Sequence, residues 1–311
     1  MVIRSFAEIA QTLDANGTLD GLPFMPEMLP YCGQAASVSA RLDKICVESP
    51  WFQFRRLEDV VTLEGLECSG AAHGGCQRSC RILWKQAWLR AEDDVAPPFE
   101  DRGLDGEAPY PSFQTQRSDS SYVCQSSELP VATLDPVGNL RFRWFSELAV
   151  GNVSAAQGFK RVVLPLCLLI REHFTGIRPH QMSGRLESTP RGTLGLQPGD
   201  WVEIKSLAEI QCTLDKESKN RGLSFTRLMA DFCGKRAQVK CRVERFILEG
   251  SGEMRTVSDT VILENLTCDG CISPGGCSRG AYHFWREIWL RPLREVSDSD
   301  SGHQVSERLE P

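Results

Sequence analysis

Internal repetition constrains the fold of this chain more than any other feature of its sequence. The segment IRSFAEIAQTLD at residues 3–14 returns as IKSLAEIQCTLD at residues 204–215, which is an offset of 201 positions. The same register continues downstream, where Trp84 corresponds to Trp285. Matching over roughly 90 residues is typical of a duplicated domain and not of chance similarity. The sequence therefore predicts one fold built twice.

The repeat divides the chain into five parts. A chain of 311 residues has room for more than one domain. A stretch rich in proline, glycine and aspartate follows the first copy, and a Pro-Gly-Asp turn opens the second. We predict copy A at 1–92, a linker at 93–117, a partly helical middle region at 118–190, copy B at 196–293 and a disordered tail at 294–311.

Local patterns predict a strand, a short helix and further strands within each copy. Ser5 with Glu8 three residues later has the pattern of a capping box, which recurs at 206–209. The stretches 237–248 and 257–268 alternate or are rich in β-branched residues, as is typical of strands.

The segment after the Cys-rich loop of copy A has helical spacing. Cys76 and Cys80 are four residues apart, and so are Trp84 and Trp88. Residues at this spacing lie on one face of an α-helix. We therefore predict a helix that begins near Cys76 and carries both tryptophans.

Two resemblances add an expectation for the fold. A turn-opened strand, a helical insertion and further strands resemble an SH3-like small barrel, and TRLMADFCGKRAQV at 226–239 resembles a pattern in the SH3-like domain of nitrile hydratase β-subunits. Through LDGLPFMPEM at 19–28 and YVCQSSEL at 122–129, the whole chain resembles an uncharacterised bacterial family often encoded near biosynthetic genes. The expected fold class is α+β, mainly β with helices: two tandem-duplicated SH3-like barrels with helical insertions, plus a partly helical middle region.

The Cys-rich loop of copy A has the composition of a metal site. Cys68, Cys76 and Cys80 are separated by seven and three residues, and His73 lies between them. Zinc takes four nitrogen or sulfur ligands in a tetrahedron, so either His73 or Cys46 could supply the fourth. The same thiolates would accept iron, which we consider second. Buried thiols without metal, and redox chemistry, are the alternatives.

Copy B differs from copy A at this loop. It keeps the first two cysteines but has alanine, Ala281, where copy A has Cys80. The candidate ligands of a second site are Cys268, Cys271, Cys277 and His283, with Cys241 and Cys124 as alternatives for the fourth position. A site that decayed after duplication is the other interpretation.

Composition narrows the classes of function. Thirteen cysteines, an odd number, in a chain with no evident secretory leader favour metal binding over a disulfide framework and indicate a cytoplasmic protein. A net charge of −6 argues against nucleic-acid binding, and the longest apolar run is too short to cross a bilayer. Phosphate-loop, dinucleotide, HExxH and GxSxG motifs are not present in the sequence.

These observations support two hypotheses of different class. The first is a zinc-binding accessory or interaction protein of a bacterial biosynthetic pathway, with a protein or carrier-domain partner, one or two zinc ions and an undetermined oligomeric state. The second is a metal-dependent enzyme of secondary metabolism with one open metal position. Cys32 and Cys233, which recur in both copies, are interpreted as core residues and not as nucleophiles.

Overall fold

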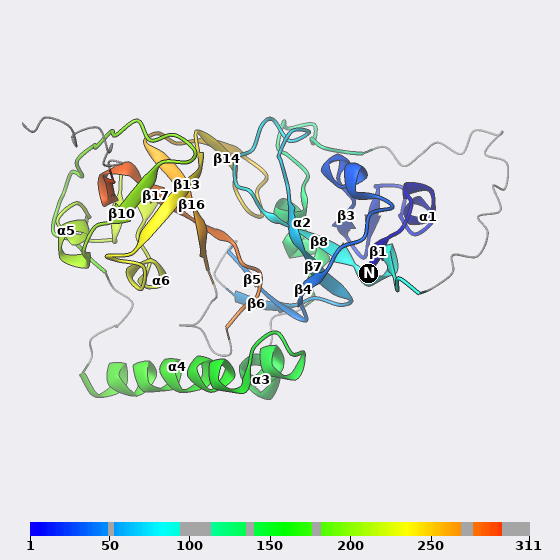
Figure 1. Cartoon of the computed structure of the whole chain (residues 1–311), viewed down its shortest axis with the longest axis horizontal. Coiled ribbons are helices and arrows are strands. Elements are labelled where there is room, and N and C mark those ends of the chain that lie inside the picture. Colours follow the sequence, from blue (N-terminus) through cyan, green and yellow to red (C-terminus); the bar gives the residue numbers. More distant parts are fainter. Residues whose placement is uncertain (49–52, 94–112, 135–139, 176–181, 269–275, 294–311) are drawn as a thin grey trace, which may run out of the picture.

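The computed structural model describes residues 1–48, 53–93, 113–134, 140–175, 182–268 and 276–293 (Figure 1). It shows two strand-rich bodies, one for each copy, with helices between them in the chain. Most of the predicted linker and the whole predicted tail lie outside the described residues. The fold is mixed, with many strands and a few helices, as the sequence predicts.

Copy A is made of short strands and three short helices. Its elements in chain order are β1 (Val2–Ile3), α1 (Phe6–Ala10), β2 (Thr18–Leu19), β3 (Leu22–Pro23), the 3-10 helix η1 (Pro26–Tyr31), β4 (Val38–Arg41), β5 (Lys44–Val47), β6 (Gln53–Arg56), β7 (Val60–Glu67), β8 (Arg81–Lys85), the 3-10 helix η2 (Gln86–Trp88) and β9 (Leu89–Arg90). The sheet β4-β7-β8 is antiparallel, and β1 pairs with β9, β2 with β3, and β5 with β6.

Copy B has the same order of elements. They are β10 (Trp201–Ile204), α5 (Leu207–Gln211), β11 (Lys219–Asn220), β12 (Leu223–Ser224), α6 (Arg227–Ala230), β13 (Arg236–Arg242), β14 (Arg245–Ile247), β15 (Met254–Thr256), β16 (Thr260–Thr267), β17 (Tyr282–Arg286), the 3-10 helix η3 (Glu287–Trp289) and β18 (Leu290–Pro292). Five strands form one antiparallel sheet in the order β17-β16-β13-β10-β18, which curls into a half-barrel. Closure into an SH3-like barrel stays a prediction.

The predicted capping boxes are confirmed in both copies. Ser5 N–H donates to Glu8 Oε2 at 2.9 Å, and the Ser5 hydroxyl accepts from the backbone of Glu8. Ser206 and Glu209 repeat these contacts at the start of α5. Each box satisfies two backbone N–H groups that the first helical turn would otherwise leave without partners.

The predicted helix after the Cys-rich loop is wrong. Trp84 lies in strand β8, and Trp88 closes the 3-10 helix η2. Both indoles are fully buried in one core, because the strand and the short helix deliver side chains four residues apart to the same side. Cys76 and Cys80 accordingly lie in a turn-rich loop, and His283 lies in strand β17.

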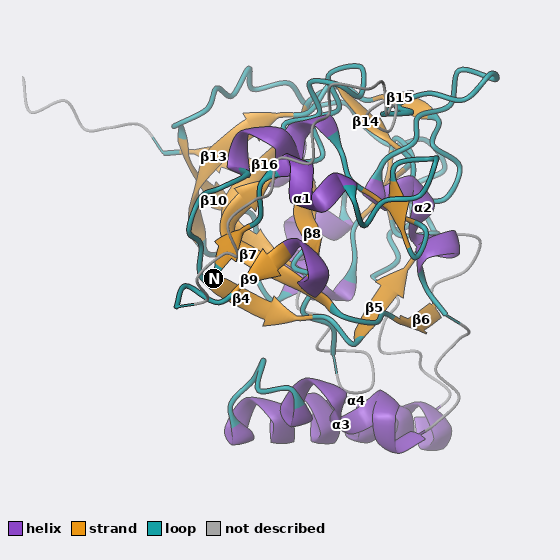
Figure 2. Cartoon of the chain, turned by 90° about the vertical axis from the view of Figure 1, so that its right-hand side faces the viewer, coloured by secondary structure: helices purple, strands orange, loops and turns teal. Residues whose placement is uncertain are grey.

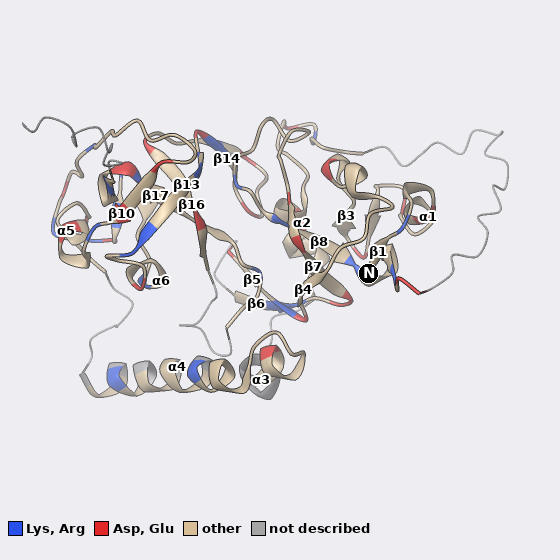
Figure 3. Ribbon diagram, in the orientation of Figure 1, with Lys and Arg blue, Asp and Glu red and all other residues tan. Residues whose placement is uncertain are grey.

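The middle region supplies the longest helices. They are α2 (Gln125–Ala132), α3 (Leu140–Ala149) and α4 (Ala155–Thr175), and the last two lie together outside the strand-rich bodies (Figure 2). Helix α2 belongs to the core of copy A, since the amide of Gln125 both accepts from Leu83 N–H and donates to Leu83 O at 2.8 Å. None of the helices in the described ranges combines the length and apolar character needed to span a bilayer. Acidic and basic side chains occur on both copies (Figure 3).

Candidate metal centre

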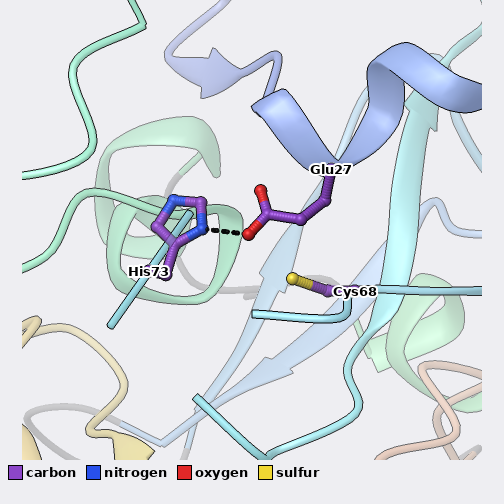
Figure 4. A group of neighbouring side chains, drawn as sticks. All are labelled: Glu27, Cys68 and His73. Atoms are coloured by element: carbon purple, nitrogen blue, oxygen red, sulfur yellow. Dashed lines mark hydrogen bonds and ion pairs between the residues drawn. The ribbon is translucent and has the colours of Figure 1, made fainter. Parts of the chain in front are cut away.

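A buried cluster in copy A brings together three metal-ligating side chains. Glu27 extends from η1, Cys68 follows the end of β7, and His73 lies in the loop between β7 and β8 (Figure 4). One ligand atom from each lies within 4.8 Å of the other two. His73 and Glu27 are only 1% and 8% exposed, so the cluster is largely withdrawn from water.

Hydrogen bonds show which nitrogen of His73 faces the cluster. Its Nε2 lies 3.0 Å from the backbone oxygen of Val123, which can only accept, so Nε2 carries the proton. The other nitrogen, Nδ1, faces Glu27 Oε1 at 2.7 Å. Metal-binding histidines commonly donate one N–H to a carbonyl and offer the other nitrogen to the ion. The carboxylate oxygen also accepts, so in the described structure Nδ1 shares a proton with Glu27, and a bound ion would take the place of that proton.

Glu27 is a carboxylate with an unsatisfied oxygen. Its Oε1 accepts from Ala72 N–H at 3.0 Å, whereas the buried Oε2 has no hydrogen-bond partner among the described residues. Burial raises the pKa of Glu27, but hydrogen bonding and charge from His73 outweigh burial and place it below the ordinary value. A buried charged oxygen without a partner is costly, and a cation would remove that cost.

A cavity of about 40 Å³ adjoins the cluster. Its lining thiols are those of Cys68, Cys76, Cys80 and Cys124. Cys124 is the N-cap of α2, so the middle region contributes to a site that is otherwise formed by copy A. Space of this size holds a few water-sized groups, which fits an ion and a small ligand.

Burial disfavours the nucleophilic thiolate form of three cysteines in this cavity. Burial raises the pKa of Cys80 to about 11, against the opposing charges of Arg78 and Arg279. Burial likewise raises the pKa of Cys68 and of Cys124. Reactive cysteines have lowered pKa values, so the environment favours metal ligation, in which the ion displaces the thiol proton, over nucleophilic or redox chemistry.

The recurring cysteines outside the loops also behave as core residues. Cys32 and Cys233 are half-buried and pack against the cores of their own copies. Burial raises the pKa of each thiol. Both observations agree with the interpretation of these two residues as packing groups.

The structure brings four of the five predicted ligands of copy A together and places the fifth elsewhere. Cys68, His73, Cys76 and Cys80 line one cavity, as the sequence suggests. Cys46, the rival fourth ligand, instead lies against Cys277 of copy B.

The structure does not bring the predicted ligands of copy B together in one described site. Cys268 and Cys277 lie near Cys46. His283 stacks beside Phe232 and Trp285, with ring centroids 5.9 and 6.4 Å away. Cys271 lies outside the described residues.

Sequence reasoning missed Glu27 as a candidate ligand. The residue lies within a matched part of the repeat, where copy B carries Leu228. A charged residue opposite an apolar one, in a segment that otherwise packs a core, was the available signal. Cys124 was considered as a ligand, and its place in the cavity agrees with that alternative.

Gly70 makes the loop geometry testable. Its φ is +68°, and a Cβ there would lie 2.0 Å from the backbone oxygen of Cys76. Gly65 has a similar φ of +71° with nothing within 4 Å of an added Cβ, so it is a matched control. We expect Gly65→Ala to cost about 1–2 kcal/mol for the left-handed backbone alone, and Gly70→Ala to cost clearly more. Urea midpoints measure this, and equal shifts would contradict the described loop.

Comparison of the chain with protein-family models, with curated proteins and with solved structures finds no match.

Proposed function

We propose that this chain is a metal-binding protein whose first site is formed by Glu27, Cys68 and His73. The observation that supports this most directly is the mutual proximity of their three ligand atoms in a buried setting. Zinc is the first candidate, because it accepts carboxylate, thiolate and imidazole together, and iron is the second.

The fourth position decides which kind of site this is. A thiolate from the same cavity, with Cys80 and Cys124 as candidates, would close the tetrahedron and make the ion structural. Such an ion would tie together η1, the loop after β7 and, through Cys124, the start of α2. Small cores gain folding free energy from an ion of this kind.

A structural ion suits an accessory or interaction protein. Two small bodies held in shape by metal would present a fixed surface to a protein or carrier-domain partner. The closed SH3-like barrels, the resemblance to a bacterial family encoded near biosynthetic genes and the cytoplasmic location belong to this proposal as expectations.

One observation favours a second candidate function. The cavity adjoins the three-ligand cluster, so water could occupy the fourth position. Three protein ligands and one open position are typical of catalytic zinc, which lowers the pKa of bound water. A metal-dependent enzyme is therefore the alternative that the same site supports.

Elemental analysis of the full-length protein tests the proposal. We expect Cys68→Ser and His73→Ala each to remove one equivalent of metal per chain, because each deletes a ligand of the same ion. Cys212→Ser is the matched control, since its thiol is exposed in copy B and should leave the metal content unchanged. Full metal content in both ligand variants would overturn the proposal.

Cobalt substitution separates the two candidate functions. In the cobalt protein, an open position binds added azide and the visible spectrum changes, whereas a closed site of four protein ligands leaves the spectrum unchanged. A changed spectrum supports the enzyme, and an unchanged one supports the structural ion.

A further inference from the structure

A second cluster of thiols is assembled from both copies. Cys46 lies in β5 of copy A, whereas Cys268 follows β16 and Cys277 lies in the Cys-rich loop of copy B. The backbone N–H of Cys46 donates to the sulfur of Cys277, and Arg279 Nη1 donates to the Cys46 carbonyl at 3.1 Å. Burial and the nearby thiols of Cys277 and Cys268 raise the pKa of Cys46 to about 12.

Equivalent contacts occur at the Cys-rich loop of copy A, where the strand comes from copy B and the loop from copy A. Ile247 of β14, which occupies the position of Cys46 in copy B, donates its N–H to Cys76 Sγ at 3.4 Å. Arg78 Nη1 donates to the Ile247 carbonyl at 3.3 Å. Each Cys-rich loop thus packs on a hairpin strand of the other copy, and the two arrangements are related by the sequence repeat.

The Cys-rich loops of the two copies are closed by equivalent backbone hydrogen bonds. Cys68 N–H donates to Cys80 O at 2.8 Å, and Cys268 N–H donates to Ala281 O at 2.7 Å. The same backbone hydrogen bond therefore closes both loops, although copy B has alanine at the position of Cys80.

The exchange between copies gives the second cluster three thiols, as many as the loop of copy A supplies to the first cluster. Copy A supplies three from its own loop. Copy B supplies only Cys268 and Cys277 from its described loop residues, but Cys46 crosses from copy A at the position where the first cluster receives Ile247. Copy B has no thiol at Ala281, and the thiol of Cys46 from copy A lies beside its remaining cysteines.

A network of ion pairs connects the two clusters. Glu249 lies 2.6 Å from Arg279 and 3.7 Å from Arg78, and Arg78 also pairs with Glu48 at 3.2 Å. Glu48 N–H donates to Glu249 Oε1 at 2.7 Å, which joins the two hairpins. Cationic Arg279 beside the second cluster favours the net negative charge of thiolates around a divalent ion.

We propose that Cys46, Cys268 and Cys277 form a second site for a thiophilic divalent ion of the zinc class, shared between the two copies. Among the described residues, the three whose ligand atoms lie within 4.8 Å of one another are Glu27, Cys68 and His73. Ion binding at the shared site therefore has to draw the sulfurs of Cys46, Cys268 and Cys277 closer together. Soft thiolate ligands select zinc, cadmium or cobalt over magnesium and calcium. The ion would fasten copy A to copy B, which goes beyond the structural or catalytic role of the first site.

Metal stoichiometry of single variants of the full chain tests this site. We expect two ions per wild-type chain in a cobalt titration of the apoprotein, read by the thiolate-to-cobalt charge-transfer absorption. Cys46→Ser and Cys277→Ser should each leave one ion. Cys233→Ser, a half-buried cysteine that packs against the core of copy B, is the matched control and should keep two.

The outcomes separate this site from the first. One ion that is lost in Cys68→Ser and kept in Cys46→Ser would overturn the shared site and leave the proposed function intact. One ion with the opposite behaviour would keep the shared site and overturn the first. No ion in the wild-type chain would overturn both.

A measurement on the wild-type chain covers the case in which a variant does not fold. Zinc should protect Cys46, Cys268 and Cys277 from alkylation, as mapped by mass spectrometry, and a chelator should remove that protection. Cys167 and Cys212 are exposed and should react equally in both conditions. Equal labelling of Cys46 with and without zinc would overturn the shared site.

Discussion

Glu249→Gln is expected to lower the free energy of unfolding by about 3–5 kcal/mol, the range for removing one partner of a buried ion pair. The carboxylate is 1% exposed and pairs with Arg279 at 2.6 Å and with Arg78 at 3.7 Å. The side chains of Arg78 and Arg279 are also mostly shielded from water, each at 13% exposure. The substitution leaves Arg279 buried without its carboxylate, and the cost of that uncompensated charge dominates.

A matched control isolates burial as the cause. Glu253→Gln removes a carboxylate from the same hairpin region, but Glu253 and its partner Arg255 are 54% and 58% exposed, so we expect a loss of about 0–1 kcal/mol. Urea denaturation at low and high salt measures both variants. Similar losses for the two, or a loss at Glu249 that disappears in high salt, would show that the cluster is solvated and does not hold the copies together.

The local structure was predictable because short-range patterns determine it. The capping boxes at Ser5 and Ser206 were evident from residues three positions apart, and the structure forms both. Strands β13 and β16 follow from alternation and β-branching over stretches of about ten residues. These features depend on local sterics and hydrogen bonding, which a single sequence carries.

The error at Trp84 and Trp88 shows the limit of spacing arguments. A separation of four residues is compatible with one helical face, but a strand followed by a 3-10 turn also places both side chains in one core. Pairing with β7 favours the strand, and Trp84 lies opposite Val61 in that pairing. A partner strand more than twenty residues away overrides local periodicity.

The contact of Cys46 with the loop of copy B could not be predicted from the repeat. Aligning the copies assigns Cys46 to copy A, and the alignment contains no sign that this residue contacts the loop of copy B. The contact between Arg279 and Cys46 spans 233 residues, and no local rule gives its geometry. Glu27 was missed for a related reason, since its role depends on His73, 46 residues away.

Trp88→Ala is the second large effect, with an expected loss of about 3–5 kcal/mol for deleting a fully buried indole. The ring packs edge-on against Phe24 at 5.5 Å, and its Nε1 donates to Thr12 Oγ1 at 3.0 Å. Alanine removes the ring contacts, leaves a cavity and deprives the Thr12 hydroxyl of its donor.

Copy B offers a replicate of this test within the same chain. Trp289 is equally buried, lies 5.3 Å from Phe225 and donates to Thr213 Oγ1 at 3.0 Å, so Trp289→Ala should cost about as much as the copy A variant by the same cavity argument. Trp201→Ala is the control, because that indole is 48% exposed and little of its surface is withdrawn from water. Urea midpoints of the three variants decide the matter. A loss in only one copy, or a loss at Trp201 as large as that at Trp88, would contradict the two equivalent aromatic cores.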